Sequence, residues 1–122
     1  MDVNSRLVEL LLRNEQEAIE TFLVRLGTLY PGRILQAILF GSKARGAAHP
    51  ESDIDILLVA DTDDWRFRHA VSDVASDVSL EYDVLIGPRI IEQTHWKQMA
   101  REGFSLYENV IREGVPISSG PI

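Results

Sequence analysis

Hydrophobic residues follow two different spacings along the first half of the chain, and these spacings predict helices and strands in alternation. Residues 5–29 carry apolar side chains at helical spacing, with Asn14 as a possible break between two helices. The run 34–40 is almost continuously apolar, which is typical of a central strand covered on both faces. Residues 53–59 read as a second strand, which begins with the aspartates at 53 and 55 and is otherwise apolar. We therefore expect a helical N-terminal region followed by two buried strands.

The second half continues the alternation. Residues 64–77 suit a helix, and 80–86 read as a third strand that the glycine-proline pair at 87–88 would break. The segment 90–113 is expected to be helical in one or two pieces, with an interruption near Gly103. A further edge strand or turn is expected after residue 113. Strands that alternate with helices predict an α/β fold, here as one domain over residues 1–122.

Composition narrows the classes of function. The 122 residues are 45% hydrophobic and 25% charged, which is ordinary for a globular protein. The absence of cysteine excludes disulfides, thiolate metal sites and a cysteine nucleophile, and it fits a cytoplasmic location. A net charge of −7 disfavours binding to bulk nucleic acid. Since no apolar stretch approaches the ~20 residues of a membrane span, no membrane association is expected.

Three aspartates are candidates for a metal centre. Asp53 and Asp55 lie two apart in a predicted strand, so their side chains project from one face roughly 6.6 Å apart. Their mutual repulsion would be relieved by a divalent cation such as Mg²⁺, which prefers oxygen ligands. Asp83 lies within the predicted strand 80–86. If that strand neighbours the first, three carboxylates would converge, enough to hold two Mg²⁺ ions about 3.5–4 Å apart for phosphoryl transfer.

A glycine turn lies between the first two predicted strands. Gly41 would let the backbone approach a ligand closely, and Ser42 could cap a short helix that Gly46 closes. Lys43 and Arg45 add positive charge beside the turn, and an arginine can bind phosphate oxygens through two N–H groups. These residues predict a phosphate-binding turn next to the aspartate pair.

These motifs together resemble a known signature. Gly-Ser-Lys-Ala-Arg-Gly at 41–46, Ser-Asp-Ile-Asp at 52–55 and the later Asp83 are similar to the nucleotidyltransferase signature of the DNA polymerase beta superfamily, and the short chain resembles its minimal members. The motifs span residues 34–86, and the ending 104–115 is weakly similar to the family's usual close. The resemblance implies a small mixed β-sheet flanked by helices.

The resemblance also implies roles for individual residues. It implies that Asp53 and Asp55 bind both metal ions and that Asp83 binds the ion that activates the nucleophile. The nucleotide-binding residues implied by the matching positions are Gly41, Ser42, Lys43, Arg45 and Ser52. All three carboxylates of the signature are present in the sequence, which indicates an active enzyme.

The activity implied is transfer of AMP from ATP to a hydroxyl, with two Mg²⁺ ions. Many minimal members resemble antitoxins that modify a tyrosine of a small helical HEPN toxin, so such a toxin is the implied partner. Two alternatives stay open. The chain could neutralise a toxin by contact alone, or it could modify a small hydroxylated molecule such as an aminoglycoside. The acceptor and the oligomeric state are not encoded in these motifs.

Two groups of residues outside the motifs can be interpreted either as structural or as functional. The acidic residues Asp61, Asp63 and Asp64 fit a loop and a helix N-cap, and could alternatively meet a basic partner. Trp65 and Trp96 fit core positions, but an exposed tryptophan could anchor a partner protein.

Overall fold

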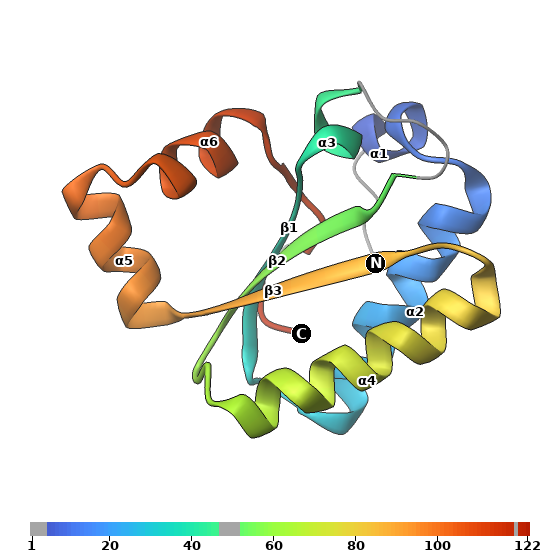
Figure 1. Cartoon of the computed structure of the whole chain (residues 1–122), viewed down its shortest axis with the longest axis horizontal. Helices are drawn as coiled ribbons and strands as arrows, with labels where there is room; N and C mark the ends of the chain where they lie inside the picture. The colour runs from blue at the N-terminus through green and yellow to red at the C-terminus, as the bar shows by residue number, and fades with distance from the viewer. Residues whose placement is uncertain (1–4, 47–51, 119) are drawn as a thin grey trace.

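A four-stranded mixed sheet with helices on both faces organises the chain, as a computed structural model describes it for residues 5–46, 52–118 and 120–122 (Figure 1). The strand order is β3-β2-β1-β4; β1 runs antiparallel to β2 and β4, and β2 runs parallel to β3. The strands are β1 Ile34–Phe40, β2 Ile54–Ala60, β3 Ile86–Glu92 and β4 Val115–Pro116. The helices are α1 Ser5–Leu10, α2 Arg13–Leu29, α3 Ser42–Arg45, α4 Trp65–Tyr82, α5 Gln93–Glu102 and α6 Ser105–Glu113. The expected α/β fold class is confirmed.

Two hydrophobic clusters cover the two faces of the sheet. Successive residues of a strand point to opposite faces, so β1 and β2 contribute to both clusters. Helices α1, α2 and α4 cover one face and α5 and α6 the other, as Figure 1 shows. The smaller cluster consists of Ile38, Leu57, Val59, Ile91, Trp96, Met99 and Val110. Burial on both faces explains why β1 and β2 are so continuously apolar. In the described parts of the chain, no helix is long and apolar enough to cross a bilayer.

The N-terminal helical region is broken, but two residues earlier than Asn14. α1 ends at Leu10, and α2 begins at Arg13. The break is fixed by Glu15, whose Oε1 accepts a hydrogen bond from the Leu12 backbone N–H at 2.8 Å. A glutamate at the third helical position commonly reaches back to the N-cap in this way.

The third strand was predicted in the wrong place. Residues 80–82 belong to α4, which runs on to Tyr82, and the strand itself is Ile86–Glu92. The alternation of apolar residues over 80–86 is misleading because Leu80 is 84% exposed, whereas Tyr82 packs back on α2. The Tyr82 hydroxyl lies 2.7 Å from Thr21 Oγ1, which holds the last turn of α4 in helical form. Asp83, expected in the middle of a strand, is instead the C-cap of α4 in the left-handed conformation, at φ 55° and ψ 49°.

The glycine-proline pair at 87–88 does not break a strand but lies inside β3. A proline has no N–H to donate, which is tolerated in an edge strand. β3 is the edge of this sheet, with β2 on one side of it. The interruption expected near Gly103 is confirmed, since Gly103 ends α5 at φ 68°. The edge strand expected after residue 113 is β4.

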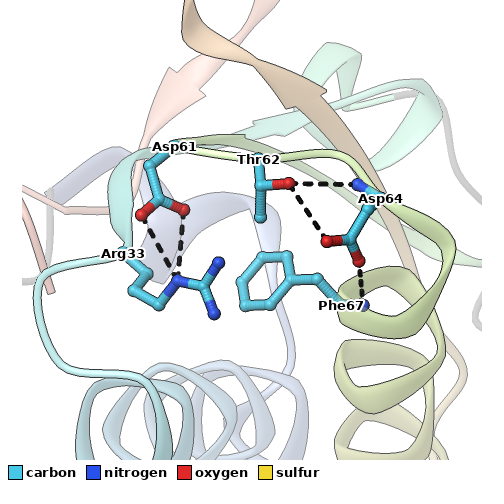
Figure 2. Close-up of polar contacts among 5 residues, drawn as sticks. All are labelled: Arg33, Asp61, Thr62, Asp64 and Phe67. Atoms are coloured by element: carbon cyan, nitrogen blue, oxygen red, sulfur yellow. Dashed lines mark hydrogen bonds and ion pairs between the residues drawn. The ribbon is translucent and has the colours of Figure 1, made fainter.

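The acidic connection from β2 to α4 has a structural role. Asp64 caps α4 by accepting a 2.9 Å hydrogen bond from the Phe67 N–H, as predicted, and Thr62 Oγ1 accepts one from the Asp64 N–H (Figure 2). Asp61 forms an ion pair with Arg33 at 3.2 Å. The Arg33 guanidinium also lies 4.6 Å from the centre of the Phe67 ring. These contacts connect the start of β1 to the end of β2, at the end of the sheet away from the paired aspartates.

Candidate active site

Asp53 and Asp55 lie where β2 begins, with Asp53 exposed and Asp55 half-buried. Asp55 pairs with Phe40, the last residue of β1, on one side and with Gly87 of β3 on the other. The carboxylate pair therefore sits between the glycine turn that follows β1 and the start of the edge strand. The predicted proximity of the turn and the aspartates is a direct result of the antiparallel register of β1 and β2.

Burial raises the pKa of the Asp55 carboxyl above its ordinary value, the neighbouring Asp53 carboxylate raises it further, and Arg45 opposes the change. A pair of carboxylates in this state is stabilised by a cation placed between them. Oxygen donors of this kind are the ligands that Mg²⁺ prefers, and one or two protein carboxylates suffice for it. Asp53 and Asp55 therefore fit a divalent metal ion.

Gly41 lies so close to the Asp55 carboxylate that a side chain in its place would displace that carboxylate. A Cβ at this position would overlap Asp55 Oδ2 and would lie 3.2 Å from Asp55 Cγ. The backbone at Gly41 is also left-handed, with φ 76°, which disfavours any residue with a Cβ. Gly41 is the N-cap of α3, Ser42 is its first residue rather than its cap, and Gly46 closes it as predicted. The turn thus brings backbone directly against the acidic pair.

Lys43 does not face this site. Its side chain is 4% exposed, and its Nζ forms a 2.6 Å ion pair with Oε2 of Glu15, which is 5% exposed. The Lys43 ammonium therefore joins α3 to α2, and the nucleotide contact expected of Lys43 stays a prediction. Glu15 was not singled out from the sequence because its partner is distant in the chain and no motif marks it.

Arg45 lines a cavity of about 380 Å³ next to the aspartate pair. Glu113 of α6 accepts from Arg45 at 3.4 Å and from Arg112 at 3.3 Å, so two guanidinium groups border the cavity. Its lining residues are Phe40, Gly41, Arg45, Leu106, Asn109, Val110, Arg112 and Glu113. No residue of α6 was predicted from the sequence to line the site. The weak similarity of the ending 104–115 to the family was the signal that could have indicated it. Guanidinium groups and the glycine turn thus line the same cavity, which suits the binding of a nucleotide phosphate.

A second cavity of about 360 Å³ is bordered by Arg68, Arg89 and His95, among other residues. Gly41 and Arg45 do not line it, and neither cavity has Asp53 or Asp55 in its lining. We place the candidate active site at the first cavity because Gly41 lines it and a Cβ on Gly41 would meet the Asp55 carboxylate.

Asp83 is not brought to the aspartate pair. It lines a separate cavity together with Ser76, Ser79 and Leu80. Within residues 5–46, 52–118 and 120–122, no three acidic or histidine side chains are close enough to hold one metal ion together. The three-carboxylate centre expected from the sequence depended on a strand over 80–86, and α4 occupies part of that segment. Ser52, half-buried, directly precedes Asp53.

The raised pKa of Asp55 leads to a prediction about stability. A carboxyl whose pKa is higher in the folded than in the unfolded state binds more protons when folded. Its contribution to stability therefore falls as the pH rises from the unfolded-state pKa to the folded-state pKa. Asp55→Asn removes this cost and is expected to raise the melting temperature of the metal-free protein at pH 7. The gain should shrink as pH falls through the raised pKa and vanish below the ordinary value of 3.8. Thermal unfolding in a chelator from pH 3.5 to 8 measures it; an equal or lower melting temperature for the variant at pH 7 would contradict it.

Comparison with known proteins places these features in a family. The model described as "Polymerase beta, Nucleotidyltransferase" matches residues 28–112, which include the glycine turn and the aspartate pair. A Methanocaldococcus jannaschii protein, MJ0604, named as a candidate protein adenylyltransferase, is 39% identical over 101 residues, or 83% of this chain and 95% of that protein.

Two solved structures share the fold. A toxin–antitoxin crystal structure with AMP-PNP aligns at a TM-score of 0.56 and 24% identity, over 88% of this chain and 73% of that one. A candidate minimal nucleotidyltransferase aligns at a TM-score of 0.51 and 23% identity, over 86% of this chain and 96% of that one. At this identity the two alignments establish the fold, in agreement with the mixed sheet described above.

Proposed function

The chain belongs to the polymerase beta nucleotidyltransferase family, and on this premise we propose that it transfers AMP from ATP to a hydroxyl of a partner protein. In this reaction the hydroxyl oxygen bonds to the α-phosphorus of ATP, the bond from the α-phosphorus to the oxygen bridging to the β-phosphate breaks, pyrophosphate leaves and the hydroxyl proton passes to solvent. The observation that carries the proposal is the close approach of Gly41 to the Asp55 carboxylate, together with the cavity that Gly41 and Arg45 both line. This arrangement can hold a triphosphate beside a metal-binding pair. The choice of AMP and of a protein acceptor is supported by the name of the M. jannaschii relative.

In this proposal each described residue has a separate task. Asp53 and Asp55 would hold Mg²⁺, which would neutralise negative charge on the nucleotide phosphates. Arg45 leaves Glu113 to bind phosphate oxygens, because a triphosphate is the stronger partner for a half-exposed guanidinium. Gly41 has no side chain, so the turn leaves room for phosphates to approach Asp55. Ser42 and Ser52 flank the phosphates from the two neighbouring segments.

We propose further that the acceptor is a tyrosine of a HEPN-type toxin and that the chain acts as its antitoxin. The shared fold with an antitoxin-containing crystal structure supports this choice. A phenolic hydroxyl has a pKa of about 10, so it loses its proton more readily than an aliphatic hydroxyl. Trp65, predicted from sequence to fit the core, is 67% exposed and offers a large apolar contact for a partner. Trp96 is buried, as predicted.

ATP labelled at the α-phosphate tests the activity. The wild-type chain and Asp55→Asn are incubated with Mg²⁺, labelled ATP and an extract of the source cells, and the proteins are separated on a denaturing gel. We expect a labelled protein band with wild type and at least a ~100-fold weaker band with the variant, because one metal-binding carboxylate is lost. ATP labelled at the γ-phosphate should give no wild-type-dependent band.

Other outcomes would replace the proposal. Label that moves to a small compound would identify a small-molecule acceptor. A toxin neutralised equally by wild type and by the Asp55→Asn variant, with no label transferred, would identify an antitoxin that acts by contact. A band of equal strength with both proteins would show that Asp55 has no part in the transfer.

A further inference from the structure

Gly87 occupies the position on β3 from which a side chain would face both aspartates. In the parallel pairing of β2 and β3 it lies directly opposite Asp55. A Cβ built on Gly87 would lie 3.5 Å from Asp55 Oδ1 and 4.0 Å from Asp53 Oδ2. The first distance is an ordinary van der Waals contact, and the backbone of Gly87 is not left-handed. A Cβ therefore fits beside the two carboxylates, and this chain has none there.

Among the described residues, Asp83 and Glu113 are acidic groups whose recorded contacts lie away from this pair. Asp83 is the C-cap of α4 and lines the cavity next to Ser79 and Leu80. Glu113 is bound to Arg45 and Arg112. In the described part of the chain, no third acidic or histidine side chain completes a cluster with the Asp53–Asp55 pair.

From this arrangement we propose that the chain alone holds one divalent cation, at Asp53 and Asp55, and that Gly87 is the position whose missing carboxylate prevents it from holding a second. The inference rests on the proposed function for the identity of the pair as a metal site. Two carboxylates neutralise one divalent ion, whereas a second ion about 3.5–4 Å away requires further negative ligands. A second ion would therefore need ligands from the substrates, such as the nucleotide phosphates and the acceptor hydroxyl.

Manganese binding to the purified chain, without nucleotide, tests the proposal. Mn²⁺ is titrated into wild type, Gly87→Asp, Gly87→Asn and Asp83→Asn, and the free ion is followed by electron paramagnetic resonance. Wild type should bind one ion. Gly87→Asp should bind a second ion or bind the first about tenfold more tightly, because affinity follows the number of charged ligands. Gly87→Asn fills the same space without charge and should match wild type.

Asp83→Asn is the control for the position predicted from sequence. Asparagine tolerates the left-handed conformation, so the fold should persist, and Mn²⁺ affinity should stay within twofold of wild type. The proposal is overturned if wild type binds two ions without nucleotide, if Asp83→Asn weakens binding more than tenfold, or if a folded Gly87→Asp binds no better than Gly87→Asn. Thermal unfolding of each variant shows that it is folded.

The result separates this inference from the proposed function. One bound Mn²⁺ with no transfer of labelled AMP would remove the proposed function and leave the one-ion centre intact. If the chain transferred AMP but bound two ions without nucleotide, the proposed function would stand and the one-ion centre would be removed.

Discussion

Alanine in place of Gly41 is expected to reduce AMP transfer by at least about 100-fold while the chain stays folded. The added Cβ would overlap Asp55 Oδ2, so the carboxylate has to move out of its position. A misplacement of about 1 Å at a reacting centre is enough for a loss of this size. The left-handed backbone, at φ 76°, adds a strain of about 1–2 kcal/mol.

Gly32→Ala is the matched control for this variant. Gly32 has nearly the same backbone, with φ 72°, but a Cβ there would meet nothing within 4 Å. Both variants should therefore lose similar stability from strain, and Gly32→Ala should keep its kcat/KM. If Gly41→Ala were as active as Gly32→Ala, the contact between the turn and Asp55 would not matter to the reaction.

Glutamine in place of Glu15 is expected to lower the free energy of unfolding by about 3–5 kcal/mol, because it removes the carboxylate that forms a buried ion pair with the Lys43 ammonium. The side chains of Glu15 and Lys43 are 5% and 4% exposed, and their charged atoms lie 2.6 Å apart. Glutamine retains an oxygen that can accept from the Leu12 N–H, so the cap of α2 is kept and the charge alone is removed. Urea unfolding measures the change.

The exposed pair Arg13–Glu17 provides the comparison on the same helix. Its side chains are 93% and 51% exposed, so Glu17→Gln should cost less than about 1 kcal/mol. Replacing both buried partners, as Glu15→Leu with Lys43→Met, should recover most of the loss, since no unpaired charge remains. A Glu15→Gln variant as stable as Glu17→Gln would show that the buried pair does not secure α3 to α2.

The elements predicted well from sequence are those whose pattern matches their burial. β1 and β2 are apolar along their length because both faces are covered, and the predicted run 34–40 coincides with β1. The run 80–86 was misassigned because an exposed Leu80 on a helix alternates with inward residues as a strand would. The correct limit of α4 depends on the contact of Tyr82 with Thr21, 61 positions away, which no local pattern contains.

The same division applies to the candidate site. Gly41, Arg45, Asp53 and Asp55 come from two motifs joined by one antiparallel strand pair, so their proximity could be predicted. Lys43 was assigned to the nucleotide because its charge is visible in the sequence, whereas its burial against Glu15 is visible in the fold alone.

Contacts over long separations escaped prediction altogether. The approach of Glu113 to Arg45 joins residues 68 positions apart and depends on where α6 packs. The register of β3 against β2, which places Gly87 opposite Asp55, also joins residues that are distant in the chain.

The most direct test of the central claim is the intact mass of the acceptor protein, identified by its label and purified after reaction with ATP and Mg²⁺. The account predicts that the acceptor gains the mass of one or more AMP groups with the wild-type chain and gains nothing with Asp55→Asn. A gain of phosphate alone, or an equal gain of AMP with the variant, would contradict transfer of a nucleotide at the Asp53–Asp55 pair.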